Sequence, residues 1–232
     1  MKVLIISDDP NSAELLTLIL RRAGLLAVTT HRADDEGALA AYAKEVPDMI
    51  FIDACTRSFD VLDICRTLRL ETIAPIFVSS PRTEEEYILQ AFDLGIDEYL
   101  PKPISPRLLV AKVNALLRRA RSVPLASISS LRAGGVELSP ERRTIRLLQR
   151  PEIHLTNLEF RLLYCLMSNQ GQVVPTETII QKVWGYSGEG DYQLVKGLVR
   201  RLRRKIDPDT KEPHYIKTVI GVGYTFSPSM EE

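Results

Sequence analysis

The sequence is poor in the features that mark the more specialised classes of protein. It has three cysteines, an odd number with no Cys-x-x-Cys spacing, which argues against a disulfide framework or a cysteine metal site. No run approaches the ~18 uncharged apolar residues of a membrane-spanning helix. The apolar start leads into Asp8 and Asp9 rather than into a signal-peptide cleavage site. We therefore expect a cytoplasmic protein with no membrane partner.

The chain also lacks an excess of charge of either sign. Its 232 residues carry 30 Lys and Arg against 30 Asp and Glu, and a net charge of zero, taken alone, argues against nucleic-acid binding. The two halves differ, however. Residues 1–121 hold 15 basic and 18 acidic side chains, whereas residues 122–232 hold 15 and 12. The neutral total therefore combines an acidic half with a basic half.

Length and composition predict two domains. Domains typically hold ~100–150 residues, so this chain has room for two. The segment between Ser122 and Gly135 is rich in Ser, Gly and Ala, which is typical of a semi-flexible linker. We predict a first domain over 1–121, a linker over 122–132 and a second domain over 133–232.

In the first half, short apolar runs alternate with segments of helical period, the pattern of a parallel sheet with crossover helices. Five strands are predicted, at Val3–Ile6, Leu25–Thr30, Met49–Ile52, Ile76–Ser79 and Glu98–Leu100. Helices are predicted over 11–23, 33–45, 58–69, 83–94 and 105–120. The expected fold is α/β, a doubly wound five-stranded parallel sheet that binds ligands outside the carboxyl ends of its strands.

Acidic residues follow two of these strands. Asp8 and Asp9 follow the first strand and Asp53 follows the third, and these strand ends are neighbours in a doubly wound sheet. Converging carboxylates repel, which favours a bound hard cation such as Mg²⁺. A carboxylate beside that cation can attack an activated phosphoryl group. Ser80 and Lys102, after the fourth and fifth strands, can supply hydrogen-bond donors.

The second half is predicted to be an α+β domain. A strand-like segment over 135–156 leads into the capping box Thr156-Asn-Leu-Glu159, which predicts the start of a helix. Two more helices are expected near Thr176–Trp184 and Tyr192–Ile206. Two short strands around a glycine turn follow within Tyr215–Phe226. This order of elements fits a winged helix-turn-helix.

The last predicted helix is strongly basic. It carries six cations and no acid: Lys196, Arg200, Arg201, Arg203, Arg204 and Lys205. At 100° per residue, its apolar residues fall on one side, and Arg200 and Arg204 face the other. A charge run is often only a solvated face, but a cationic stripe without acids favours phosphate binding. Double-stranded DNA is the expected partner, with binding that weakens steeply with salt.

These residues resemble a known family. The segment Gly95-Ile-Asp-Glu-Tyr-Leu-Pro-Lys-Pro-Ile-Ser-Pro106 and the acidic cluster are similar to the flavodoxin-like receiver domain of two-component response regulators. Val183-Trp-Gly-Tyr186 and Tyr215-Ile-Lys-Thr-Val-Ile-Gly-Val-Gly-Tyr224 are similar to the winged-helix domain of OmpR/PhoB-type regulators. The resemblance covers nearly the whole chain outside the linker. It implies a homodimeric transcriptional regulator, not an enzyme, that a sensor histidine kinase phosphorylates in a Mg²⁺-dependent reaction. Repeated DNA half-sites are the implied target, and RNA polymerase is a candidate partner.

The resemblance also implies residue roles. Asp53 matches the phosphoacceptor, Ser80 the switch hydroxyl, Tyr99 the switch aromatic and Lys102 the lysine of the site. The implied metal ligands are Asp8, Asp53 and the backbone carbonyl of Cys55, with Asp9 as a compensating acid. The implied DNA contacts are Lys196, Arg200, Arg201, Arg203 and Arg204 of the basic helix and Lys217 and Thr218 of the wing.

The chain departs from the family pattern near Asp53. Ser7 stands where an acid is usual, and Arg57 and Val61 replace a proline and a glycine that are usual in the following loop. We therefore expect weakened metal binding at this site.

A twofold dimer face is implied on the predicted fourth helix, fifth strand and fifth helix. Four charges match the cross-subunit ion pairs of the family: Asp97, Glu98, Lys112 and Arg119. A further pair is replaced by Ile88 and Leu108. These two residues could meet across the twofold axis, or could be single exposed hydrophobes, and the sequence leaves both interpretations open.

Two other functions compete with the phosphorylated regulator. An orphan regulator would bind DNA independently of phosphorylation, with a receiver that dimerises constitutively through Ile88 and Leu108. A phosphotransferase or phosphatase would use Asp53 as a turnover nucleophile, but it leaves the basic helix without a role. We favour the phosphorylated regulator.

Overall fold

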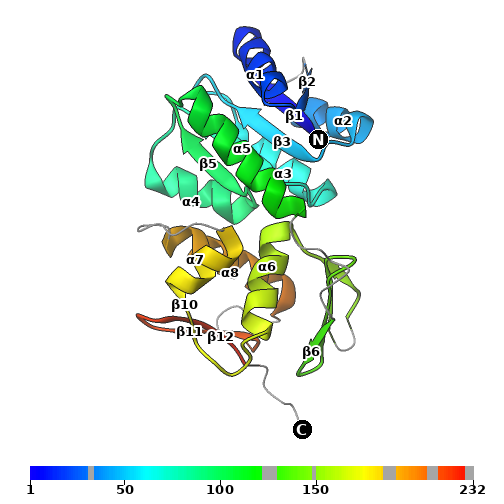
Figure 1. Cartoon of the computed structure of the whole chain (residues 1–232), viewed down its shortest axis with the longest axis vertical. Helices are drawn as coiled ribbons and strands as arrows, with labels where there is room; N and C mark the ends of the chain where they lie inside the picture. The colour runs from blue at the N-terminus through cyan, green and yellow to red at the C-terminus, as the bar shows by residue number, and fades with distance from the viewer. Residues whose placement is uncertain (31–33, 122–129, 148–149, 185–191, 208–213, 228–232) are drawn as a thin grey trace. The chain divides into compact units, whose positions relative to one another are not determined.

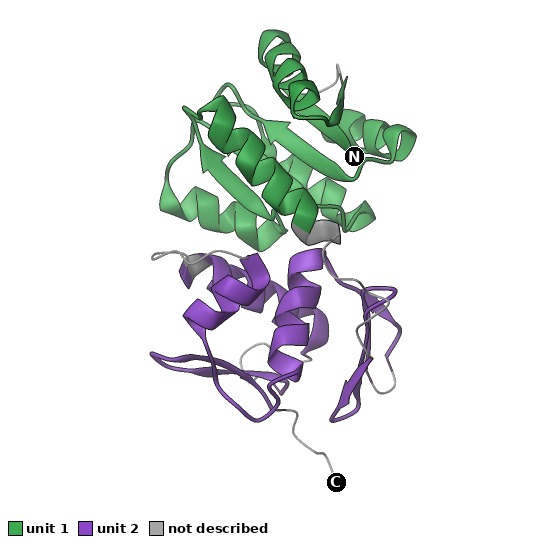
Figure 2. Cartoon of the chain, viewed as in Figure 1, with its two compact units in different colours: residues 1–121 green, residues 122–232 purple. Residues whose placement is uncertain are grey.

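The chain folds into two compact units, residues 1–121 and 122–232 (Figure 2). The computed structural model describes residues 1–30, 34–121, 130–147, 150–184, 192–207 and 214–227, apart from the side chains of 119–121 and 193. No helix in these ranges has both the length and the apolar character needed to cross a membrane.

The first unit is a five-stranded parallel sheet with helices on both faces (Figure 1), which confirms the predicted α/β fold. Its strands, in the order β2-β1-β3-β4-β5, are β1 (Lys2–Ser7), β2 (Leu26–Thr30), β3 (Met49–Asp53), β4 (Ile76–Ser80) and β5 (Glu98–Pro101). Its helices are α1 (Pro10–Arg22), α2 (Asp35–Glu45), α3 (Val61–Glu71), α4 (Glu85–Leu94) and α5 (Pro106–Arg121). The strands β3 and β4 are buried along their whole length, as expected for central strands covered on both faces.

Helices α1 and α5 cover one face of this sheet. Val3 and Phe51 point from β1 and β3 into a cluster with Leu20 of α1 and Val113 of α5, because successive side chains of a strand point to opposite faces. Helices α2, α3 and α4 lie along the other face, where α3 contacts both α2 and α4 (Figure 1). This packing fixes the carboxyl ends of the strands as one edge on which functional side chains gather.

In its described residues, the second unit has two antiparallel sheets and three helices, which confirms the predicted winged helix-turn-helix. The first sheet is formed by β6 (Leu131–Ala133), β7 (Val136–Ser139), β8 (Thr144–Leu147) and β9 (Ile153–His154). The second sheet has the order β10-β12-β11, with β10 (Val174–Pro175), β11 (Ile216–Val219) and β12 (Gly223–Phe226). The helices are α6 (Asn157–Met167), α7 (Thr176–Trp184) and α8 (Tyr192–Ile206).

One predicted boundary differs from the structure. Leu131 and Arg132, assigned to the end of the linker, pair with β7 and belong to the first sheet of the second unit. Residues 122–129 of the predicted linker lie outside the described residues. The pairing of so short a strand depends on a partner that the local composition does not reveal.

The core of the second unit lies between its helices and its sheets. Phe160, Leu202 and Phe226 pack in one buried cluster with residues of β7 and β8. The predicted capping box starts α6, since Thr156 accepts from the backbone of Glu159 and Glu159 accepts from the backbone of Thr156. Gly223 is needed where β12 passes β10, because a Cβ atom there would lie 2.1 Å from a backbone oxygen.

Candidate phosphoacceptor site and nucleic-acid interface

Residues predicted from separate strand ends meet at one edge of the parallel sheet. The register pairs Ser7 of β1 with Asp53 of β3, and Asp53 with Ser79 of β4. Ser80 then pairs with Pro101 of β5. The sheet therefore brings the ends of β1, β3, β4 and β5 around the Asp53 carboxylate.

The Asp53 carboxylate is buried, with 2% of its side chain exposed, and is surrounded by donors. Lys102 Nζ lies 2.7 Å from Oδ1. The other oxygen, Oδ2, accepts hydrogen bonds from Ser12 Oγ at 2.6 Å, from Ser7 Oγ at 3.1 Å and from the Cys55 thiol at 3.4 Å. A buried charge is tolerated when it is paired and hydrogen-bonded, and these protein groups meet that need.

Lys102 carries its charge in this pocket. Burial lowers the pKa of its ammonium group, but the hydrogen bond to Asp53 and the charge of that carboxylate raise it by more, so the pKa lies above its ordinary value. The same nitrogen lies 3.1 Å from Sγ of Cys55. Lys102 thus holds a fixed positive charge where a phosphoryl group on Asp53 would need one.

The two other acids of the predicted metal site make different contacts. Asp8 accepts hydrogen bonds from the backbone of Cys55 at 2.6 Å and of Thr56 at 2.9 Å, and from Thr56 Oγ1 at 2.6 Å. Burial raises the pKa of Asp8, but these bonds lower it by more. Asp9 caps α1 by accepting from the backbone of Asn11 at 3.0 Å. In the part of the chain that the structure describes, no group of three His, Cys, Asp or Glu side chains is placed to hold a metal ion.

This donor set does not fit Mg²⁺ well. The ion requires near-octahedral oxygen ligands, usually with one or two carboxylates free to coordinate it. The carboxylate oxygens of Asp8 and Asp53 already accept several hydrogen bonds from the protein. The predicted ligation by Asp8, Asp53, the Cys55 carbonyl and Asp9 therefore stays a prediction, and the contacts of these residues argue against it.

The two predicted switch residues contact the segment between β4 and α4. Ser80 Oγ accepts from the backbone N–H of Arg82 at 3.2 Å, and the Tyr99 hydroxyl donates to the carbonyl of Arg82 at 2.8 Å. Burial raises the pKa of Tyr99. Arg82 in turn donates to the carbonyl oxygen of Arg57, in the loop after Asp53, at 2.7 Å. Arg82, which the sequence analysis did not identify, therefore links both switch residues to that loop.

Three of the four charges predicted for a dimer face form ion pairs within the first unit. Asp97 is 2% exposed, and its Oδ2 lies 2.7 Å from Nη2 of Arg69 in α3. A buried carboxylate needs a partner inside the same core, and Arg69 fills that role. This contact argues against a cross-subunit ion pair at Asp97, which stays a prediction. Glu98, 6% exposed, pairs with Lys112 of α5 at 3.0 Å.

The other predicted residues of this face are accessible or undescribed. Leu108 of α5 is 46% exposed, and Ile88 of α4 is half-buried. The side chain of Arg119 lies outside the described residues. An apolar contribution to self-association thus remains available on α4 and α5.

Two cations of α8 face the interior. Lys205 Nζ lies 2.7 Å from Oε2 of Glu159 in α6, and Arg201 Nε lies 3.5 Å from Oε1. Burial raises the pKa of Glu159, but the two cations lower it by more, so this buried side chain is ionised. Arg201 is only 8% exposed. The burial of Arg201 and its pair with Glu159 argue against a contact with DNA, and that contact stays a prediction.

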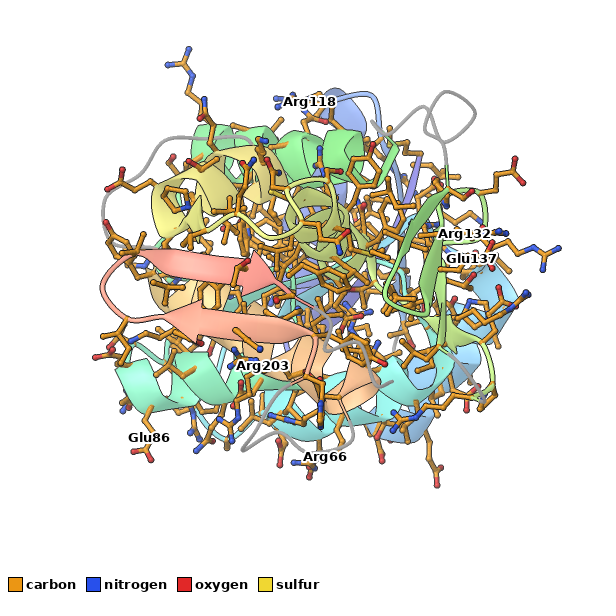
Figure 3. All side chains as sticks on the ribbon, turned by 90° about the horizontal axis from the view of Figure 1, so that it is seen from below. Arg66, Glu86, Arg118, Arg132, Glu137 and Arg203 are labelled. Atoms are coloured by element: carbon orange, nitrogen blue, oxygen red, sulfur yellow. The ribbon has the colours of Figure 1, made fainter. Side chains whose placement is uncertain are left out.

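A third cation ties α8 to the wing, the hairpin of β11 and β12. Arg203, labelled in Figure 3, donates from Nε and Nη2 to the carbonyl oxygen of Ile216 at 3.0 and 2.7 Å. Nη2 also donates to Thr218 Oγ1 at 2.8 Å. Both Arg203 and Thr218 were predicted to contact DNA, and in the structure they contact each other. Their contact with DNA stays a prediction.

The remaining cations are exposed on the outer side of α8 and on the wing: Lys196, Arg200, Arg204 and Lys217. A groove of about 600 Å³ separates the start of α8 from the wing, and Tyr192, Lys196 and Thr218 line it. The turn of the wing is apolar, with Ile220 93% exposed. A cationic helix face beside an exposed hairpin is the arrangement with which winged helices approach duplex DNA.

A receiver-type sheet with a buried carboxylate paired to a lysine, followed in the chain by a winged helix, defines the class of DNA-binding response regulators. Residues 3–114 match the model of the response regulator receiver domain, and residues 149–226 match the model described as transcriptional regulatory protein, C terminal. The chain belongs to the OmpR/PhoB-type DNA-binding response regulators of two-component systems. Members of this class bind DNA and are phosphorylated by histidine kinases, and their receiver domains generally bind Mg²⁺.

Two relatives are similar over nearly their whole length. The chain is 36% identical over 228 residues to the DNA-binding response regulator MtrA of Mycolicibacterium smegmatis, covering 98% of this chain and 97% of that protein. It is 35% identical over 236 residues to the DNA-binding dual master transcriptional regulator RpaA of Synechocystis sp., covering 100% and 97%. A solved structure of a RitR mutant, 24% identical and covering 98% and 99%, has a TM-score of 0.80 and shows the shared fold. The homologues are thus transcriptional regulators.

Proposed function

We propose that this chain regulates transcription and that its receiver accepts a phosphoryl group on Asp53 from a sensor histidine kinase. The observation that carries the proposal is the buried Asp53 carboxylate with Lys102 Nζ 2.7 Å from Oδ1. In the transfer, a carboxylate oxygen bonds to phosphorus as the bond from phosphorus to the donor nitrogen breaks. The Lys102 ammonium group stabilises the negative charge that this step brings into the pocket.

Intact mass spectrometry tests the phosphorylation. The full chain is incubated with a small phosphodonor in a buffer that contains Mg²⁺. We expect a mass increase of one phosphoryl group, which disappears in Asp53→Ala and persists in Asp35→Ala, a matched change at an exposed aspartate on α2. Absence of the adduct in the wild-type chain, or its persistence in Asp53→Ala, contradicts the proposal.

The second unit, in this proposal, binds repeated half-sites of double-stranded DNA as part of a homodimer. The exposed cations of α8 and Lys217 of the wing would neutralise backbone phosphates, which gives the strong salt dependence of such complexes. Ile88 and Leu108 are the residues proposed to join the receivers, and RNA polymerase is a candidate partner of the DNA-bound dimer.

The contacts of Asp53 favour a second candidate, a regulator that works without phosphorylation. Both oxygens of Asp53 already accept hydrogen bonds from protein donors. The polar groups of the pocket are therefore paired with one another when no phosphoryl group is present. In that case Ile88 and Leu108 would hold the receiver as a constitutive dimer. Size-exclusion chromatography of the unphosphorylated chain separates the candidates, because a monomer at micromolar concentration contradicts the second one.

A further inference from the structure

The oxygen Oδ2 of Asp53 is enclosed by two serine hydroxyls from different elements. Ser7 ends β1, and its Oγ lies 3.1 Å from Oδ2. Ser12 lies in the first turn of α1, and its Oγ lies 2.6 Å from the same oxygen. Ser7 Oγ also accepts from the backbone N–H of Asp9 at 3.3 Å, which joins the end of β1 to the cap of α1. Both serines are therefore held in place by the fold.

A hydroxyl and a carboxylate are opposite kinds of neighbour for Oδ2. A hydroxyl donates a hydrogen bond to Oδ2 and adds no negative charge beside it. A carboxylate in its place would repel Asp53, and a divalent cation between the two would relieve that repulsion. Asp8, the other acid at this edge, accepts hydrogen bonds on both of its oxygens from the loop at Cys55 and Thr56. The pocket thus holds two carboxylates that accept hydrogen bonds from the protein, the ammonium group of Lys102 and two serine hydroxyls.

We infer that Ser7 and Ser12 make this pocket independent of a divalent cation. The two hydroxyls position and stabilise Asp53 at the oxygen that would otherwise face a metal, so they act as positioning residues. The inference builds on the proposed phosphoacceptor pocket, but it concerns cation affinity and not phosphoryl transfer. It follows that a carboxylate at position 7 converts the pocket into a cation site.

Isothermal titration calorimetry of the full chain with MgCl₂ tests this inference. We expect no saturable binding by the wild-type chain, and an affinity for Mg²⁺ at least about tenfold higher in Ser7→Asp, because two facing carboxylates attract the cation. Ser7→Ala removes the hydroxyl without adding charge, so its affinity for Mg²⁺ should rise much less than that of Ser7→Asp. Gln172→Glu adds the same charge at an exposed residue of the second unit, and its affinity for Mg²⁺ should equal that of the wild type. Adding Asp53→Ala to Ser7→Asp should abolish the gain.

Ser7 is only 9% exposed, so Ser7→Asp could fail to fold. A second variant therefore tests the same inference at another residue. Ser12→Asp places a carboxylate in the first turn of α1, where helices favour acids, and its side chain is half-buried. Melting temperatures in MgCl₂ and in EDTA are compared for all variants. The cation should raise the melting temperature of Ser7→Asp or Ser12→Asp and leave the wild type unchanged.

The inference is overturned if the wild-type chain binds Mg²⁺ as tightly as Ser7→Asp, or if neither aspartate variant gains affinity or thermal stability. These outcomes are separate from the fate of the proposed function. If Asp53 forms no phosphoryl adduct while Ser7→Asp still gains affinity, the phosphorylation proposal fails and the role of the two serines stands.

Discussion

At the scale of single residues, the cations of α8 divide by what they contact. Lys196 is exposed and lines the groove beside the wing, whereas Arg203 is bonded to Ile216 and Thr218 of the wing. An exposed lysine that neutralises a phosphate contributes to the salt dependence of DNA binding. An arginine that fixes the angle between helix and wing contributes to affinity without releasing a counterion.

We therefore expect Lys196→Ala and Arg203→Ala to weaken DNA binding in different ways. Lys196→Ala should lower the slope of log affinity against log salt by about 1, because one phosphate contact is lost. Arg203→Ala should lower affinity with almost no change of slope. Fluorescence anisotropy with a random-sequence duplex at several salt concentrations measures both quantities. A fall of the slope by about 1 in Arg203→Ala would assign that arginine to the phosphates.

The sequence predicted some of these roles and could not predict others. Asp53 and Lys102 were identifiable because both follow apolar strands, and parallel strand ends share one edge of a sheet. The contact of Ser12 with Asp53 depends on how α1 packs on the sheet, and no local sequence pattern predicts that packing. Arg201 and Arg203 look like any other cation on a helical wheel, because their partners lie in α6 and β11.

At the scale of elements, a single arginine joins α3 to the segments that lead into the strands β4 and β5. Arg69 donates to backbone carbonyls of Thr72, Ala74 and Gly95 and pairs with the buried Asp97. Its side chain is 10% exposed. Removing it leaves the Asp97 carboxylate buried without its counter-charge.

Arg69→Ala should accordingly destabilise the first unit by about 3–5 kcal/mol, the usual cost of breaking a buried ion pair from one side. Arg66→Ala is the matched control on the same helix. Its side chain is 57% exposed (labelled in Figure 3), and its pair with Asp63 should contribute less than about 1 kcal/mol. Urea unfolding of both variants measures the difference, and equal losses would show that Arg69 is no more important than a surface arginine.

In the second unit, Glu159 joins α6 to α8. Its pKa in the folded protein lies below the ordinary value of 4.5, so its contribution to stability is present above that value and is lost as pH falls through the lower folded pKa. Replacing the carboxylate by an amide removes this dependence. Glu159→Gln should destabilise the second unit near neutral pH, and the loss of stability on acidification below about pH 4.5 should be smaller than in the wild type.

Unfolding in urea across this pH range checks the prediction, with Glu177→Gln on α7 as the exposed control. A wild-type profile as flat as that of Glu159→Gln would mean that the Glu159 carboxylate does not stay ionised in the folded protein.

The capping box around Glu159 was predictable from four adjacent residues. Its pairing with Arg201 and Lys205 was not, because the partners are more than forty residues away along the chain.

Most elements were predictable because their patterns are local. The runs in β3 and β4 are continuous and apolar since both faces of these strands are buried, and α6 begins at its capping box. Strand β6 begins two residues before the predicted start of the second domain at residue 133, because Leu131 and Arg132 form a strand only by pairing with β7. Asp97 was placed on a surface because the sequence does not show that Arg69 lies beside it.

At the scale of the whole molecule, control by phosphorylation requires a large shift between association states. Moving an equilibrium from 1:99 to 99:1 takes ~5.5 kcal/mol. Cross-subunit ion pairs were predicted to supply part of this free energy. In the structure their charges form ion pairs within one chain, Asp97 with Arg69 and Glu98 with Lys112. The apolar residues Ile88 and Leu108 are then the main candidates for the contact between receivers.

Self-association should therefore depend on Leu108 and respond little to salt. In a twofold dimer each substitution acts on both chains, so Leu108→Glu should raise the dissociation constant by at least about a hundredfold, given the ~1.5–3 kcal/mol that each buried leucine contributes. Leu70→Glu is the matched control, since Leu70 is 81% exposed on α3, away from the proposed face.

Sedimentation velocity at low and high salt measures both variants beside the wild type. Ion pairs on the surface weaken with salt because of screening, whereas an apolar contact keeps or gains strength. A dimer that dissociates at high salt, or one that Leu70→Glu disrupts as strongly as Leu108→Glu, would show that charges or another surface join the chains. A dimer that withstands salt and is lost only in Leu108→Glu would place the apolar contact at the centre of assembly, whether or not Asp53 is phosphorylated.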